Sequence, residues 1–164
     1  MSKSMKSNLT SACFSLIMVF SVSGNAVADN HGALVPDSHS DAMTMMLDNA
    51  AKFIETFNRG NITELADLYT EDAIQSGTNM TEPLYGRAAI KASMEKNADE
   101  IVTRDILSTE VFTAHDLGNG YIAANGSWEI HDKEGARVRG GLWSNLYRVV
   151  DGEMLMFRES ASRN

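Results

Sequence analysis

Residues 140–154 read GGLWSNLYRVVDGEM, and this stretch decides the fold class. Apolar and polar side chains alternate along it, and this period of two is that of a β-strand. Asp151 and Gly152 then supply a two-residue turn of the kind that joins hairpins. The stretch therefore predicts two antiparallel strands, over 136–150 and 153–161.

The region before this hairpin alternates in the same way. Residues 105–114 and 121–131 predict two further strands, and turn-forming residues stand at 116–120 and 132–135. Short turns between successive strands favour antiparallel pairing. We therefore expect a four-stranded antiparallel meander.

Upstream of these strands, apolar residues recur at spacings of three and four, which is the period of an amphipathic helix. They predict a first helix from about residue 40 to Gly60. Asn61, with Glu64 three residues later, predicts the capped start of a second helix that ends near Asp72.

A short extended piece over 73–76 and a third helix over about 87–100 complete the predicted elements. Three N-terminal helices packed on one curved antiparallel sheet make an α+β architecture.

The N-terminus has the three parts of a secretory signal. Lys3 and Lys6 give it a positive start, residues 12–22 are mostly apolar, and the small residues at 26–28 (AVA) suit cleavage. The apolar run is too short to span a bilayer, and no second one follows. We expect residues 1–28 to be removed on export, with no membrane association afterwards.

The only cysteine, Cys13, lies within this signal, so the mature chain has no disulfide. Export without disulfides favours a bacterial periplasm. Residues 29–40 are polar and carry Gly32 and Pro36, which predicts a flexible arm. The remaining residues, 41–164, then form a single domain.

The mature chain is acidic. Removal of Lys3 and Lys6 from the 14 basic residues leaves 12 against 22 acidic residues, a formal net charge of −10. Such a domain repels phosphate backbones and anionic surfaces. We therefore expect neither a nucleic acid nor a membrane as its partner.

Three stretches resemble the NTF2-like superfamily in its SnoaL-like or DUF4440 form: FIETFNRGNITELADLYTEDA (53–73), LYGRAAIKASM (84–94) and GGLWSNLYRVVDGEM (140–154). The resemblance covers roughly residues 41–161. It implies the ketosteroid isomerase-like fold, a cone in which helices cover the concave face of a curved sheet and a pocket opens between them. It does not imply one activity, because this fold hosts enzymes as well as non-catalytic binding domains.

Strand alternation then assigns the inside of this cone. If Asn145 points into the cone, Trp143 and Tyr147 point the same way. The expected ligand-binding residues are Phe53, Tyr69, Arg139, Trp143, Asn145 and Tyr147.

Val138, Leu142 and Leu146 have the opposite parity and predict an apolar convex face. An exposed apolar face of this kind needs a cover. Homodimerisation through the sheet, which the resemblance implies, would provide one.

The resemblance also locates the positions that steroid isomerisation needs. That chemistry uses a carboxylate base beside a tyrosine and a protonated aspartic acid that together hold the enolate oxygen. The resemblance puts the base at Gly77, the tyrosine at Phe53 and the second acid at Asn145. Two of the three positions lack the needed chemistry, so we expect no steroid isomerase activity.

Four residues remain candidates for catalysis: Asn145, Arg139, Asp72 and His131. Asn145 and Arg139 carry hydrogen-bond donors suited to a carbonyl or a carboxylate, and His131 is a general-base candidate. Each residue also has a structural explanation. Arg139 would pair with a nearby acid such as Glu159 on the neighbouring strand, whereas His131 would face solvent. Asp72 would sit in a turn.

Neither a metal-ligand spacing nor a nucleotide-binding glycine motif occurs in the domain, so we expect no cofactor. One metal hypothesis concerns the new N-terminus. Cleavage after Ala28 would leave Asp29, Asn30 and His31 with a free amine, a donor set that can wrap a square-planar Cu(II) or Ni(II) ion.

Three functions fit this sequence. The first is an exported domain that binds a small, partly apolar molecule in the cone-shaped pocket. The second is a cofactor-independent enzyme of the SnoaL-like type, acting as an isomerase, cyclase, dehydratase or hydrolase. The third is a dimeric interaction module without a small ligand.

Overall fold

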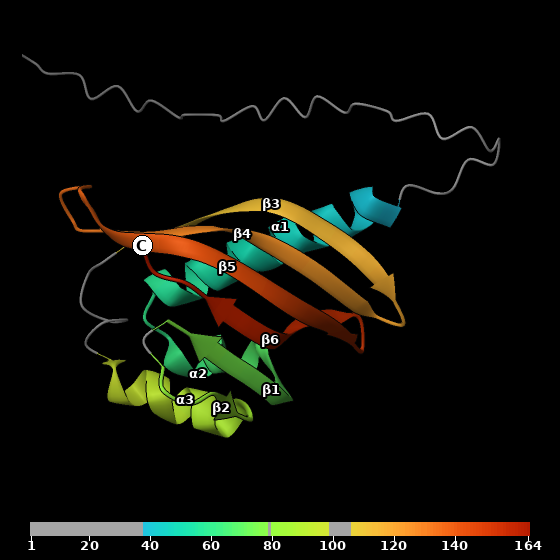
Figure 1. Ribbon diagram of the computed structural model, residues 1–164, viewed down its shortest axis with the longest axis horizontal. Coiled ribbons are helices and arrows are strands. Elements are labelled where there is room, and N and C mark those ends of the chain that lie inside the picture. The colour runs from blue at the N-terminus through green and yellow to red at the C-terminus, as the bar shows by residue number, and fades with distance from the viewer. Residues whose placement is uncertain (1–37, 79, 99–105) are drawn as a thin grey trace, which may run out of the picture. The chain divides into compact units, whose positions relative to one another are not determined.

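The computed structural model describes residues 38–78, 80–98 and 106–164. Figure 1 shows how the helices are arranged beside a strongly curved sheet. The elements in chain order are α1 (Ser38–Asn58), α2 (Ile62–Asp67), β1 (Tyr69–Gly77), β2 (Leu84–Tyr85), α3 (Arg87–Lys96), β3 (Ile106–Gly118), β4 (Tyr121–His131), β5 (Arg137–Val150) and β6 (Glu153–Ala161).

The sheet has six strands in the order β2-β1-β6-β5-β4-β3. The predicted meander of β3 to β6 is confirmed, because each of these neighbours pairs antiparallel. The sequence did not predict that β1 joins the sheet, parallel to β6, with the short β2 on its outer side. The extended piece expected at 73–76 is thus the second half of a longer strand.

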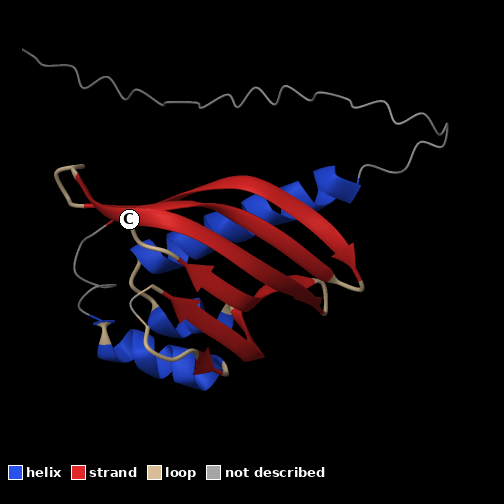
Figure 2. Cartoon of the chain, in the orientation of Figure 1, coloured by secondary structure: helices blue, strands red, loops and turns tan. Residues whose placement is uncertain are grey.

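The helices lie against one face of the sheet (Figure 2). Helix α1 packs on β3, and α2 and α3 pack against each other and against β1. The side chain of Asn58, at the end of α1, holds the edge strand by donating to the Leu107 carbonyl at 3.1 Å and accepting from the Leu107 N–H at 2.8 Å. Asn49 in the same helix donates to the Met154 carbonyl at 2.7 Å. These bonds attach α1 to β3 and to β6, the first and last strands of the meander.

Helix α2 is shorter than predicted. It ends at Asp67, and Tyr69 already begins β1. The Met156 N–H of β6 donates to the Leu68 carbonyl at 2.8 Å, so backbone pairing with the sheet takes over directly after the helix. The prediction that Asp72 stands at a helix end, in a turn, is therefore wrong, because Asp72 lies within a strand.

The predicted cap of α2 is present in part. The side chain of Asn61 accepts a hydrogen bond from the Glu64 N–H at 3.2 Å. The carboxylate of Glu64 binds Arg59 at 2.8 Å, however, instead of returning to the cap residue.

Two further bounds differ from the prediction. Helix α3 ends at Lys96, and the predicted continuation to residue 100 falls partly outside the described residues. Strand β3 continues to Gly118, four residues beyond the expected end, because the turn to β4 is tighter than predicted. Asn119 and Gly120 form that turn with φ angles of 54° and 76°, a backbone region that asparagine and glycine tolerate best.

Candidate functional site

A cavity of about 610 Å³ lies between the helices and the concave face of the sheet. Six aromatic side chains contribute to its wall: Phe53, Phe57, Tyr69, Trp128, Trp143 and Tyr147. Of the charged residues that the structure describes, three line it as well, namely Arg139, Glu159 and Arg163. The cavity is thus largely apolar and aromatic, with a few polar groups that could orient a ligand.

All six residues that the sequence named as ligand-binding line this cavity: Phe53, Tyr69, Arg139, Trp143, Asn145 and Tyr147. Tyr69 and Tyr147 are buried, at 1% and 2% exposure, and Trp143 and Asn145 are below 10%. The strand parity deduced from Asn145 is therefore correct. That these residues bind a ligand stays a prediction.

The strongest polar feature of the cavity is a carboxylate that the sequence did not single out as functional. Both the Tyr69 hydroxyl, at 2.6 Å, and the Gln75 amide nitrogen, at 2.7 Å, donate to Glu159 Oε2. Glu159 is surrounded by protein, and the surface that it still exposes borders the cavity. Burial raises the pKa of this carboxyl, and the hydrogen bonds from Tyr69 and Gln75 lower it in part.

Glu159 faces the cavity because β6 contains one extra residue. In the pairing of β5 with β6, Tyr147 lies opposite Met156 while Leu146 lies opposite Arg158, so Phe157 is inserted between them. Simple alternation from Met156 would turn residue 158 inward. Because of the bulge, the Glu159 side chain points inward instead, and Arg158 is exposed. A β-bulge has no clear sequence signal, which is why this residue was missed.

Asn145 and Tyr147 form a second polar pair next to Glu159. The Asn145 carbonyl oxygen accepts from the Ser160 N–H at 3.1 Å, and its amide nitrogen donates to the Tyr147 hydroxyl at 3.3 Å. Burial raises the pKa of both Tyr147 and Tyr69, so the two phenols remain protonated and can act as hydrogen-bond donors.

The two tryptophans form part of the cavity wall, and the indole N–H of each is hydrogen-bonded. The Trp143 indole N–H lies 2.8 Å from Thr109 Oγ1 and 3.0 Å from the Ser127 carbonyl. The Trp128 indole N–H donates to the Ser162 carbonyl at 3.0 Å. Their rings are therefore fixed in place and face a ligand mainly with apolar surface.

The chain after β6 forms part of the cavity wall through Ser162 and Arg163. The Ser162 N–H donates to the Leu142 carbonyl at 2.8 Å and the Asn164 N–H to the Gly140 carbonyl at 3.1 Å. This C-terminal strap, residues 162–164, crosses directly over Gly141, where a Cβ would overlap the Ser162 carbonyl oxygen. Glycine at 141 is thus required by the close passage of another segment.

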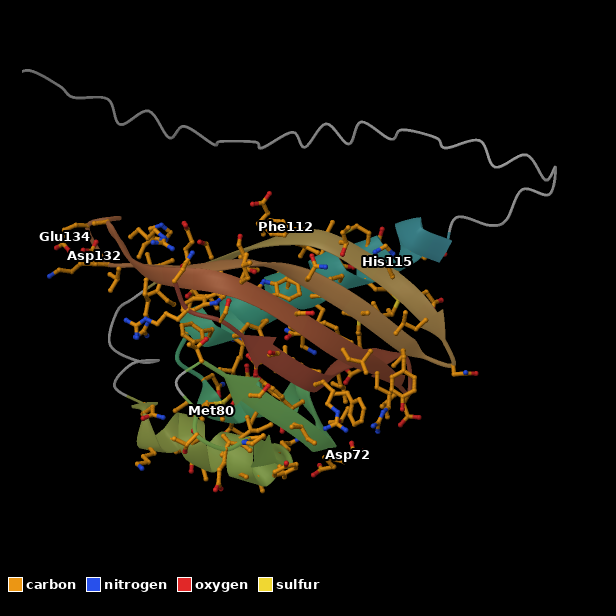
Figure 3. The ribbon with its side chains drawn as sticks, in the orientation of Figure 1. Asp72, Met80, Phe112, His115, Asp132 and Glu134 are labelled. Atoms are coloured by element: carbon orange, nitrogen blue, oxygen red, sulfur yellow. The ribbon has the colours of Figure 1, made fainter. Side chains whose placement is uncertain are left out.

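Two of the four catalytic candidates do not line the cavity. Asp72 binds Arg148 through both carboxylate oxygens, at 3.2 and 3.0 Å, and Figure 3 shows it at the end of β1. His131 lies 3.3 Å from Glu129, which also accepts from Arg137 at 2.9 Å on the outer side of the sheet. The idea that Asp72 or His131 lies at the pocket is wrong, because strand parity turns both away from it.

The other two catalytic candidates, Asn145 and Arg139, do line the cavity. Glu159, the acid suggested as a structural partner of Arg139, accepts from Tyr69 and Gln75. That Arg139 pairs with a nearby acid stays a prediction. The three positions that the resemblance assigns to steroid isomerisation, Gly77, Phe53 and Asn145, also border the cavity.

The outer face of the sheet exposes several apolar residues. Val138 and Leu142 in β5 are 52% and 55% exposed, and Phe112 in β3 is 48% exposed. Figure 3 shows Phe112 on the side of β3 that faces away from the helices. Leu146, expected on the same face, is only half-buried rather than open. A dimer through this face stays a prediction.

Metal and membrane sites were sought across the described ranges. No group of three or more acidic, histidine or cysteine side chains there could hold a metal ion. The hypothetical copper or nickel site at Asp29, Asn30 and His31 lies outside the described residues, as do the predicted signal and most of the arm. Of the described helices, none has the length and apolar character needed to cross a bilayer.

Comparisons with known structures agree on the fold. An NTF2-like protein of unknown function from Shewanella oneidensis superposes with a TM-score of 0.63 at 15% identity, covering 73% of this chain and 98% of that one. A ketosteroid isomerase-like protein from Erwinia carotovora atroseptica gives 0.59 at 15% identity, covering 75% and 96%. A Catenulispora acidiphila protein in complex with S-DNPA gives 0.63 at 13% identity, covering 76% and 94%.

No curated protein matches the chain. The SnoaL-like domain family, in contrast, matches residues 50–155, which run from the middle of α1 into β6. This match spans the second half of α1, strands β1 to β5 and the start of β6. The structural neighbours include a protein described as having a cystatin-like fold. The chain therefore belongs to the SnoaL-like domain family, with an NTF2-like, ketosteroid isomerase-like α+β fold.

Proposed function

We propose that this protein is an exported SnoaL-like domain that binds a small, partly apolar molecule in the cavity between its helices and its sheet. The observation that carries the proposal is the cavity itself. Its volume of about 610 Å³ falls within the range of roughly 300–1,000 Å³ that small-molecule sites occupy. Its wall combines six aromatic side chains with the Glu159 cluster, a mixture of apolar surface and few polar groups.

The position of the polar groups supports binding over simple packing. Glu159, Asn145 and Tyr147 are gathered at one part of the wall instead of being spread over the surface. A related fold is seen with a small molecule, since the Catenulispora acidiphila protein is in complex with S-DNPA. Residues 1–28, with the features of a secretory signal, support export to a bacterial periplasm.

A second candidate function is cofactor-independent proton transfer. Glu159 favours it, because burial raises the pKa of this carboxyl, and a carboxylate with a raised pKa is a stronger proton acceptor. Steroid isomerisation is not the reaction that we propose. Gly77 and Phe53, at the family's base and tyrosine positions, have neither a carboxylate nor a hydroxyl.

A pair of neighbouring substitutions on α1 tests the binding proposal. Ala50→Phe would place an aromatic ring inside the cavity and obstruct part of it, because Ala50 lines it and is 7% exposed. Ala51→Phe adds the same ring at the next, exposed position of the helix. With circular dichroism showing that both variants fold, ligand binding should be lost only in Ala50→Phe. Equal binding by both variants would place the ligand elsewhere.

The ligand itself can be sought by mass. A native mass spectrum of protein recovered from the periplasm, compared with its denatured spectrum, should show an excess mass that is lost on denaturation. The denatured mass should correspond to a chain beginning at Asp29. A chain that retains residues 1–28 would contradict the proposed export.

A further inference from the structure

Glu159 is a carboxylate for which the described part of the cavity supplies no counter-ion. Its two hydrogen-bond donors, Tyr69 and Gln75, are neutral, and both reach the same oxygen, Oε2. None of the ion pairs formed among the described residues includes Glu159. A carboxylate withdrawn from water is costly unless an opposite charge approaches it.

The remaining wall of the cavity suits a cation. The faces of tryptophan, tyrosine and phenylalanine attract positive charge, and the attraction strengthens where water is excluded. Trp143 and Tyr147 stand on β5, the strand next to Glu159, and Phe53 contributes from α1. A group that is both cationic and partly apolar would satisfy the carboxylate and the aromatic wall together.

Among the described residues, the two arginines that line the cavity stand apart from Glu159 along the chain. Arg139 precedes Asn145 by six residues along β5, a separation of roughly 20 Å at about 3.3 Å per residue. The Asn145 side chain accepts a hydrogen bond from the N–H of Ser160, the residue after Glu159. Arg163 follows Glu159 by four residues, roughly 13 Å of extended chain. The backbone positions of both arginines are thus separated along the chain from that of Glu159, and no ion pair among the described residues joins either of them to it.

We propose that the molecule bound in this cavity is an organic amine, whose protonated amino group contacts the Glu159 carboxylate while its apolar part packs on the aromatic wall. The donors to Oε2 orient the carboxylate and leave Oε1 to accept from the ammonium group. This inference rests on the proposed function, because it requires that the cavity binds a small molecule at all.

Matched probe compounds test the charge requirement. The chain's two tryptophans, Trp128 and Trp143, both line the cavity, so their fluorescence reports its occupancy. We expect 4-phenylbutylamine to bind at least about tenfold more tightly than 4-phenylbutan-1-ol, which has the same shape and no charge. Glu159→Gln should abolish the difference. Glu110→Gln, the same change at an exposed position of β3, should preserve it.

A second measurement keeps the test decisive if Glu159→Gln does not fold. On the unaltered protein, amine affinity should fall on acidification as Glu159 takes up a proton, while alcohol affinity stays constant. Among the residues that the structure describes, the other titratable ones that line the cavity are Tyr69, Tyr147, Arg139 and Arg163. Burial raises the pKa of both tyrosines, so neither phenol loses its proton over an acidic to neutral range.

The remaining outcomes separate this inference from the proposed function. Equal affinity for the amine and the alcohol would overturn the amine inference and leave the binding function supported. Tighter binding of 4-phenylbutyrate than of the amine would overturn it too, and would point to Arg139 or Arg163 as the group that the ligand contacts. If no probe bound, the inference would be wrong, and the native mass spectrum would judge the binding function by itself.

Discussion

The Tyr69 hydroxyl donates a 2.6 Å hydrogen bond to Glu159, a residue 90 positions later in the chain, and this contact joins β1 to β6 inside the cavity. The bond serves both the fold and the site. It connects β1 and β6, the one pair of described strands that run parallel. It also lowers the pKa of the Glu159 carboxyl, which burial raises.

Replacing Tyr69 with phenylalanine should destabilise the protein by about 2 kcal/mol, because a buried hydrogen bond to a charged acceptor is lost. The ring of Tyr69 stays, so the cavity wall is kept. Tyr85→Phe removes a hydroxyl from a residue that is 67% exposed, and its cost should be close to zero. Urea unfolding followed by circular dichroism measures both. Equal small costs would mean that the Tyr69–Glu159 bond contributes little.

The pKa of Glu159 also predicts an unusual dependence of stability on pH. Its folded pKa is raised above the unfolded value of about 4.3, so the folded state holds the proton more tightly. The resulting stabilisation is complete below about pH 4.3 and is lost as the pH rises through the folded pKa. Glu159→Gln should therefore gain stability relative to the unaltered protein as the pH rises through this window. A constant difference between the two unfolding curves would contradict the assigned direction.

Asp72 should respond in the opposite direction. Its hydrogen bonds to Arg148 lower its pKa, so the stability they confer is present above the unfolded value of about 3.9 and is lost as the pH falls through the folded pKa. Asp72→Asn should cost a small amount of stability at neutral pH and nothing in strong acid. Glu82→Gln, an exposed loop control, should cost nothing at either pH. Urea unfolding at the two pH values compares them.

The order and type of the main elements could be predicted from sequence because they depend on local periodicity. The helix that contributes Phe53 and the strand that carries Trp143, Asn145 and Tyr147 each show their buried face in the spacing of their own residues. The side of β5 that faces the cavity was predicted correctly for the same reason.

The Glu159 cluster could not be predicted because it depends on contacts between distant segments. Tyr69 pairs with Met156 only once the chain has folded, and Gln75 meets Glu159 through the parallel pairing of β1 with β6. The bulge at Phe157 then decides which residue of β6 faces inward. Arg148 and Arg158 stack on the Phe157 ring at 4.0 and 4.6 Å, an arrangement that holds the bulged residue on the outer side.

The C-terminal strap predicts the effect of a single methyl group. In Gly141→Ala the new Cβ would overlap the Ser162 carbonyl oxygen, so the strap must shift and lose its bond to Trp128. We expect a loss of about 1–3 kcal/mol, a change in tryptophan fluorescence and faster hydrogen exchange at the Ser162 N–H. Gly135→Ala also strains a turn, but the Cβ that it adds meets nothing within 4 Å. It should leave the exchange at Ser162 unchanged, and equally fast exchange in both variants would argue against the overlap.

The apolar outer face predicts how the protein associates. If the sheet face that exposes Val138 and Leu142 is a dimer contact, Leu142→Glu should convert the dimer to a monomer, because a carboxylate would be buried without a partner. Leu47→Glu places the same charge on a residue of similar exposure, 52% against 55%, on α1 instead of the sheet. Light scattering coupled to size-exclusion chromatography should therefore report a monomer only for Leu142→Glu. A dimer that tolerates glutamate at position 142 would exclude this face as the contact, and an unaltered protein that is monomeric would remove the need for one.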